Sequence, residues 1–124
     1  MENEFIPYEE ALALKELGFD KPCFGFWLSN KTIQVDTESG AAMLSAFGNV
    51  TYFKAPLYQQ AFKWFREKYR LQAEILWRGD MGCFCYKTGE FKYGSHEFSE
   101  NDYNTYEEAE LECLKKLIEI VKNK

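Results

Sequence analysis

Short connections in the second half of the chain restrict the fold more than any other feature of the sequence. Three strand-like segments, at 71–78, 83–87 and 90–93, are separated only by Gly79-Asp80-Met81-Gly82 and by Thr88-Gly89. Connections this short cannot carry a parallel crossover, so the three strands are predicted to be antiparallel neighbours. Apolar residues at every second position from Leu71 to Trp77 predict one dry face and one mostly polar face for the first strand.

Three helices are predicted from their termini and their apolar periodicity. The first runs from Pro7 to about Leu17, because proline suits a first helical position and Gly18 suits a left-handed helix end. In the second helix, 56–69, the apolar residues fall within an arc of about 160°, which predicts a buried face. The third begins at the capping box Thr105-Tyr106-Glu107-Glu108 and runs to about position 121.

Further strands are predicted at 23–28, 32–36 and 50–54, and a polar loop at 94–104. Residues 36–49, rich in Gly, Ala and Ser, give no clear prediction. The tetrapeptide Tyr-Glu-Glu-Ala occurs at 8–11 and again at 106–109, which we interpret as two helix starts rather than a duplication. We therefore expect a single α+β domain over residues 1–124. Three helices would pack on an antiparallel sheet of about six strands in the order α-β-β-β-α-β-β-β-α.

Composition and charge exclude several classes of partner. The 124 residues carry a formal net charge of −5, which argues against binding to nucleic acid or to an anionic membrane surface. No apolar run has the roughly 20 residues of a membrane span, and Met1-Glu2-Asn3-Glu4 does not resemble a signal peptide. We expect a cytoplasmic protein that does not bind membranes.

The four cysteines are expected to be free thiols in a reducing compartment. Cys83 and Cys85 form a C-x-C pair, but zinc sites normally use two C-x₂₋₄-C or similar pairs, and the sequence offers no second one. On one strand these two side chains share a face, and we interpret them as small core residues beneath a helix. No metal site is predicted.

Catalytic machinery is sparse. His96 is the only histidine, and it lies in the predicted polar loop, where we expect it to be exposed and without a catalytic role. The sequence contains no nucleophile elbow, phosphate-binding loop or dinucleotide fingerprint. We therefore predict no cofactor and favour a non-enzymatic protein.

Three segments carry a family resemblance. They are Tyr8-Glu9-Glu10-Ala11-Leu12-Ala13-Leu14-Lys15-Glu16-Leu17-Gly18-Phe19, Ala55-Pro56-Leu57-Tyr58-Gln59-Gln60-Ala61-Phe62-Lys63-Trp64-Phe65-Arg66, and the segment from Thr105 through Leu114. Together they resemble small uncharacterised proteins of gut Bacteroidota and of their phages and prophages. The resemblance implies an intracellular protein from a phage or a mobile element, and it implies no activity.

One surface feature suggests binding. Gln59, Lys63, Arg66 and Arg70 fall within about 60° on the exposed side of the second predicted helix. The simplest interpretation is a solvated helix face, and the functional one is a docking face for an acidic partner. We predict a non-enzymatic interaction protein of unknown partner. The alternative is a protein that sequesters or hydrolyses a small nucleotide, with Lys63, Arg66, Arg70 or Arg78 on phosphate.

Nucleic-acid binding is a weaker alternative. Residues 56–122 follow the element order of a double-stranded-RNA-binding domain, an analogy of fold order alone. The third helix, however, begins with Tyr106-Glu107-Glu108-Ala109-Glu110, which places three acids where phosphate would bind.

The aromatic content of 18% also suggests exposed aromatic anchors. The candidates are Tyr52, Tyr58, Tyr86, Tyr93 and Tyr103.

Overall fold

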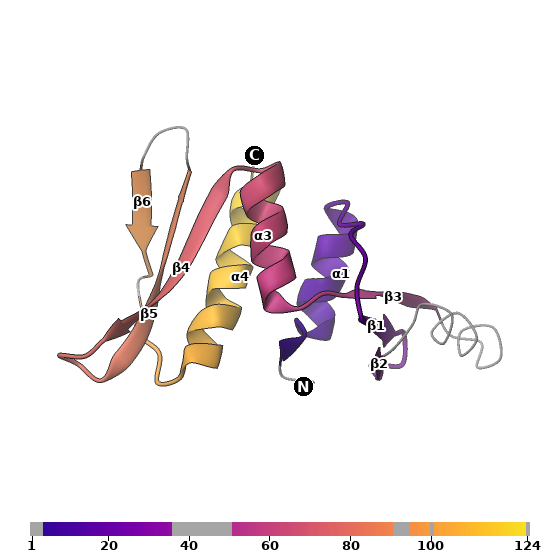
Figure 1. Ribbon diagram of the computed structural model, residues 1–124, viewed down its shortest axis with the longest axis horizontal. Helices are drawn as coiled ribbons and strands as arrows, with labels where there is room; N and C mark the ends of the chain where they lie inside the picture. Colours follow the sequence, from indigo (N-terminus) through magenta and orange to yellow (C-terminus); the bar gives the residue numbers. More distant parts are fainter. Residues whose placement is uncertain (1–3, 36–50, 91–94, 100, 124) are drawn as a thin grey trace. The chain divides into compact units, whose positions relative to one another are not determined.

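The computed structural model describes residues 4–35, 51–90, 95–99 and 101–123 (Figure 1). The chain divides into two compact units, Met1–Gln60 and Ala61–Lys124, and the boundary falls within one helix. Each unit is described by itself below. The single domain expected from the sequence therefore stays a prediction.

The first unit combines one helix with a three-stranded antiparallel sheet of order β2-β1-β3. Its elements are α1 (Tyr8–Glu16), β1 (Gly25–Leu28), β2 (Ile33–Val35) and β3 (Tyr52–Ala55). Helix α1 ends as predicted, because Gly18 adopts φ 96° and the following Phe19 N–H donates to the Leu14 carbonyl at 3.0 Å. This turn returns the chain toward the sheet.

The core of the first unit lies between α1, the N-terminal segment and the sheet. Ile6 and Leu14 are buried there. Phe26 is buried on the other face of the sheet, where its ring meets Tyr52. The indole Nε1 of Trp27 donates to the Ile6 carbonyl at 2.9 Å, and the Tyr8 ring meets Trp27 edge-on with centroids 5.8 Å apart. The N-terminal segment is therefore held by side chains of β1 and not only by its own backbone.

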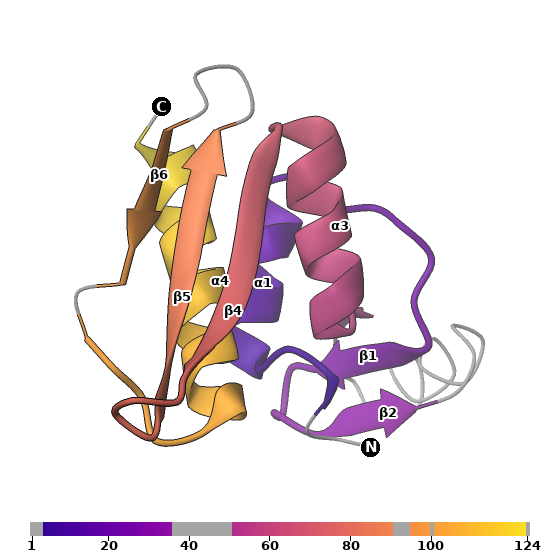
Figure 2. The same cartoon turned by 60° about the vertical axis from the view of Figure 1, so that its left-hand side comes forward.

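The second unit contains most of α3 and a three-stranded antiparallel meander of order β4-β5-β6. The elements are α3 (Tyr58–Lys68), β4 (Leu71–Arg78), β5 (Cys83–Glu90), β6 (Ser95–Phe98) and α4 (Tyr106–Lys122). Helix α4 runs along one face of this sheet (Figures 1 and 2). The predicted cap is confirmed, because the Thr105 hydroxyl accepts from the Glu108 N–H at 3.2 Å.

Two boundaries in the meander differ from the prediction. Thr88-Gly89 is not a turn, since β5 continues through it to Glu90, and β6 occupies part of the predicted loop. Thr88 pairs with Ala73 on one side and with Glu97 on the other, and it is only 3% exposed. Pairing on both sides outweighs the local turn preference of Thr-Gly. Positions 91–93 of the predicted strand lie outside the described residues.

The buried positions of Cys83 and Cys85 confirm that they are core residues, but they do not lie beneath α4. Their neighbour Phe84 meets Tyr106 of α4 edge-on, with centroids 5.9 Å apart, and Tyr86 also faces α4. Side chains alternate along a strand, so the two thiols point to the opposite face. There Arg78 and Asp102 lie beside Cys83.

The fold is α+β with helices and strands in the predicted order, and the described residues contain three helices. The two sheets are not copies of one motif, since the first strand is central in one and the second strand is central in the other. This difference agrees with the interpretation of the repeated tetrapeptide as two helix starts. None of the described helices has the length and hydrophobicity of a membrane span.

Candidate functional site

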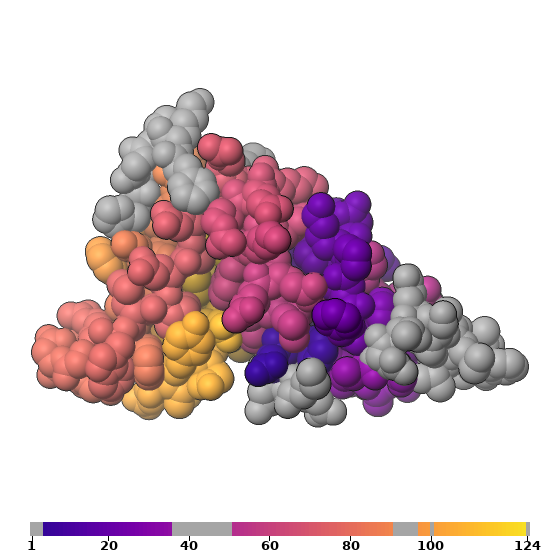
Figure 3. All heavy atoms as spheres, in the orientation of Figure 1, coloured from indigo at the N-terminus to yellow at the C-terminus, as the bar shows by residue number. Residues whose placement is uncertain are grey.

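The predicted basic face lies on α3 and just beyond it. Gln59, Lys63 and Arg66 are exposed on α3, and Arg70 is exposed after its end. Figure 3 shows the surface of α3 in magenta near the centre of the view. Gln59 belongs to the first unit and the three cations to the second. We therefore define the α3 cation cluster as Lys63, Arg66 and Arg70.

Arg70 is not on the helical wheel where the sequence pattern placed it. Helix α3 ends at Lys68, and Arg70 adopts φ 58°, in the left-handed region. The Tyr69 N–H still donates to the Phe65 carbonyl at 3.0 Å, so the chain leaves the helix between Tyr69 and Arg70. Helical periodicity could not predict this, because it assumes that the helix continues.

Carboxylates engage Lys63 and Arg66 only weakly. Lys63 pairs with Glu67 one turn later at 3.9 Å, and both side chains are exposed, so the pair is weak. Arg66 forms no ion pair within the described part of the chain. The neighbouring Lys68 is engaged differently, since its Nζ lies 5.1 Å from the centroid of the Trp64 ring.

Arg78 does not belong to this cluster. Its guanidinium pairs with Asp102 at 3.4 Å. Arg70 immediately precedes β4 and Arg78 ends it, so the two are separated by the length of that strand, roughly 25 Å. One phosphate group cannot contact both residues.

The thiols are poorly suited to nucleophilic catalysis. Burial raises the pKa of Cys23 to about 11 and that of Cys113 to about 12. Burial also raises the pKa of Cys83, and the nearby Asp102 carboxylate raises it further. A thiolate is the reactive form, so these three thiols are protonated and unreactive at neutral pH. No group of three or more possible metal ligands occurs among the described residues.

The second unit has a polar cavity of about 670 Å³ between β5, β6 and α4. Tyr86 and Tyr103 stack there with centroids 6.2 Å apart, beside Glu112 and Glu119. Burial, together with Tyr103, Cys113 and these two carboxylates, raises the pKa of Tyr86 to about 12. Three glutamates line the cavity, Glu97, Glu112 and Glu119, against the single cation Lys116, which pairs with Glu119 at 3.9 Å. This excess of negative charge makes the cavity unfavourable for phosphate or another anion.

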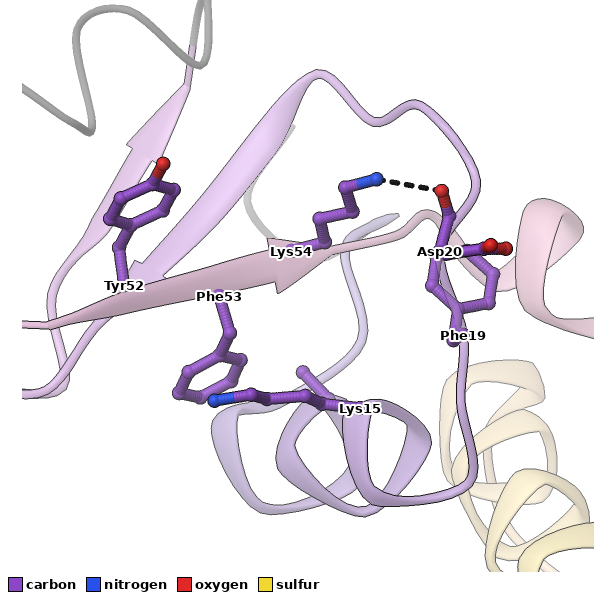
Figure 4. Close-up of a pocket in the computed structure, with 7 residues that line it drawn as sticks. Lys15, Phe19, Asp20, Tyr52, Phe53 and Lys54 are labelled. Carbon is purple, nitrogen blue, oxygen red and sulfur yellow. Dashed lines mark hydrogen bonds between the residues drawn. The ribbon is translucent and has the colours of Figure 1, made fainter.

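The first unit has a hollow of about 320 Å³ between α1, β3 and the turn after α1 (Figure 4). Two lysines line it, Lys15 from α1 and Lys54 from β3, together with aromatic side chains. Lys54 Nζ donates to the Asp20 carbonyl at 2.7 Å, and Lys15 Nζ lies 5.8 Å from the Phe53 ring centroid. Sequence analysis did not single out either lysine, because they lie far apart in the chain and belong to no motif.

The predicted aromatic anchors are only partly accessible. Tyr58 is buried, which contradicts its prediction as an exposed anchor, because it lies on the core side of α3. Tyr52, Tyr86 and Tyr103 are half-buried. Tyr93 and the side chain of His96 lie outside the described residues. Trp77, predicted on a dry face, is 59% exposed at the end of β4, where it packs on Phe84 with centroids 4.8 Å apart.

Comparison with known proteins adds no relationship. No protein-family model matches the chain, and no curated protein or solved structure matches it. The functional argument therefore rests on the residues of this chain alone.

Proposed function

We propose that this chain is a non-enzymatic binding protein and that the α3 cation cluster contacts an acidic protein partner. The observation that carries the proposal is the backbone of Arg70. A non-glycine residue in the left-handed region costs about 1–2 kcal/mol, yet an arginine stands there. Lys31 has a similar backbone, with φ 66°, so the strain alone assigns no role. It supports one for Arg70 because this residue directly follows the helix that carries Lys63 and Arg66.

The end of α1 provides an internal comparison. There the left-handed residue after the helix is Gly18, which adopts this conformation without a steric penalty. A glycine at position 70 would adopt the left-handed conformation after α3 with less strain than arginine does. We infer that Arg70 serves to place a guanidinium beside Lys63 and Arg66.

The chemistry of the cluster fits carboxylates. Guanidinium groups bind carboxylates through two parallel hydrogen bonds, and three cations within positions 63–70 favour an acidic partner electrostatically. The chain itself carries a net charge of −5, so this positive surface stands against an acidic background. Such a contrast restricts binding to one face.

Replacing Arg70 with glycine separates structural from functional roles. We expect Arg70→Gly to keep the free energy of unfolding or to raise it by up to about 1 kcal/mol, because glycine relieves the left-handed strain. Urea denaturation measures this. A loss of more than about 0.5 kcal/mol would show that Arg70 is retained for stability and would remove the main support for the proposal.

Charge reversal tests binding directly. The triple variant Lys63→Glu, Arg66→Glu, Arg70→Glu should capture the acidic partner at least tenfold less than wild type, measured by quantitative mass spectrometry on affinity-purified complexes. Each exposed substitution should change stability by no more than about 0.5 kcal/mol.

The control triple is Lys21→Glu, Lys31→Glu, Lys122→Glu. It also takes the net charge from −5 to −11. Lys31 resembles Arg70 in its positive φ of 66°. It also resembles Lys63, because it forms an exposed ion pair, with Glu9, at 3.9 Å. Wild-type capture by the control triple supports the proposal. Equal loss in both triples would mean that only bulk charge matters.

Location and origin complete the proposal. The free thiols support a cytoplasmic protein, and the resemblance of the helix-starting segments supports an origin in a phage or a mobile element. The expected partner is then a cytoplasmic protein with an acidic surface.

A further inference from the structure

The polar cavity of the second unit lies between one face of the meander and one side of α4. Tyr86 and Thr88 alternate along β5 with Lys87, which pairs with Glu74 on the opposite face of the sheet. Thr88 and Glu97 are direct partners across β5 and β6, so their side chains share the face toward α4. Figure 2 shows β5 and β6 in front of α4. Side chains of the sheet and of the helix therefore line the same cavity.

Three charged residues of α4 line this cavity. Glu112, Lys116 and Glu119 follow one another at intervals of four and three residues, which places them on one side of the helix. The two glutamates are about two turns apart, or roughly 10 Å along the helix axis. Glu112 also pairs with Lys115 at 3.3 Å, but both side chains are partly exposed, so this pair is weak. With Glu97 from β6, the negative charge is spread along the cavity.

Thr88 gives the cavity an unused hydrogen-bonding group. It is the only polar side chain that is buried in the part of the chain that the structure describes, and it is 3% exposed. Its hydroxyl forms no hydrogen bond with any other described residue, and the residue lines the cavity. A buried hydroxyl without a partner is costly, and its oxygen can accept an N–H group from a ligand.

The spacing of the carboxylates favours an elongated cation. The described residues hold no group of three or more possible metal ligands, so the cavity does not suit a single metal ion. An extended polyamine carries ammonium groups at intervals along its chain, and its terminal groups lie about as far apart as two helix turns. Tyr86 and Tyr103 line the cavity as well, and their phenol oxygens are further acceptors for N–H groups.

We propose that this cavity binds a small linear polyamine. Its ammonium groups contact Glu112 at one end and Glu119 at the other, and an N–H between them donates to the Thr88 hydroxyl. Lys116 is the competing cation of the chain itself, because it already pairs with Glu119. The site shares no residue with the α3 cation cluster and has the opposite charge, so either proposal can fail alone.

The test uses spermidine and butylamine, which carries a single ammonium group. Each is titrated into the ¹⁵N-labelled full chain at about 0.15 M salt, which screens general attraction to the acidic chain, and followed by NMR. Spermidine should bind at millimolar concentration or below, as its roughly ten heavy atoms allow, and shift amide signals of residues 86–88, 97–99 and 112–119.

Butylamine should bind at least about fivefold more weakly than spermidine, because it reaches only one of the two glutamates at a time. Mg²⁺ at the same concentration is the control for a general counter-ion effect. Equal affinity for the two amines, equal shifts with Mg²⁺, or shifts confined to other residues would overturn the proposal.

Two pairs of variants identify the charges responsible. Glu112→Gln with Glu119→Gln should weaken spermidine binding at least about fivefold, because glutamine keeps the shape of the side chain and loses its charge. The control Glu74→Gln with Glu107→Gln removes two negative charges from the same unit, outside the cavity, and should change affinity less than about twofold. Equal weakening by both pairs, or none by the first, would contradict the proposal.

Two single variants should act in opposite directions. Lys116→Met should tighten spermidine binding at least about threefold, because it removes the competing cation and keeps most of the apolar stem. Its control, Lys87→Met, removes a cation from the opposite face of the sheet and should change affinity less than about twofold. Thr88→Val replaces the hydroxyl with a methyl group and should weaken binding at least about threefold.

Weaker spermidine binding in Lys116→Met, or unchanged binding in Thr88→Val, would contradict the proposed contacts. The comparison of the two amines on the wild-type chain tests the proposal even if a variant unfolds.

Discussion

Phe26→Ala should lower the free energy of unfolding by about 3–5 kcal/mol. Phe26 is 2% exposed in the centre of β1, and its ring meets that of Tyr52 edge-on at 6.0 Å. Truncation removes the transfer free energy of the ring and leaves a cavity that the surrounding core fills only partly. Urea denaturation, with the slope checked for constancy, measures the loss.

Phe24 is the matched control because it is the same residue type two positions earlier. Regular alternation would put both rings on one face of a strand, but β1 begins only at Gly25 and Phe24 is 67% exposed. Phe24→Ala should therefore change stability by no more than about 0.5 kcal/mol. Similar losses in the two variants would contradict the position of the β1 start.

Gly25→Ala should cost about 3 kcal/mol, at the upper end of the usual range for overpacking. A Cβ at this position would lie 2.6 Å from Cε1 and 2.9 Å from Cδ1 of Phe5. Phe5 is itself buried, so its ring cannot move aside without disturbing the N-terminal segment. The loss is measured by the same denaturation experiment.

A double-mutant cycle assigns this cost to one contact. In a Phe5→Leu background the clashing ring atoms are absent, so Gly25→Ala should cost at least about 1 kcal/mol less than in wild type. The same cost in both backgrounds would mean that Gly25 is required for another reason and that the close approach of Phe5 is not the cause.

The fold was largely predictable where local signals and tertiary packing agree. Three features could be predicted because each depends on a short stretch of sequence: the Thr105 cap, the helix end at Gly18 and the strand Leu71–Arg78. Prediction was wrong at Thr88-Gly89, where neighbours distant in the sequence decide the conformation. Strand pairing on both sides is not visible in a local pattern.

The candidate sites were less predictable. Exposure of Lys63 and Arg66 followed from helical periodicity, but the left-handed backbone of Arg70 did not, because arginine gives no signal for it. The hollow is lined by Lys15 and Lys54, which belong to different elements and are brought to the same edge of the sheet only by the packing of α1 against β3. A single sequence does not show which residues of distant elements will line the same hollow.

Zero-length cross-linking tests the proposed binding surface most directly. A carbodiimide joins a lysine ammonium to a carboxylate only when the two are in contact, and peptide mass spectrometry of the affinity-purified complex locates the bond. We expect cross-links from Lys63 to Asp or Glu of the partner, and none from Lys21, Lys31 or Lys122. Cross-links confined to those three lysines would contradict the proposal that the α3 cation cluster contacts an acidic partner.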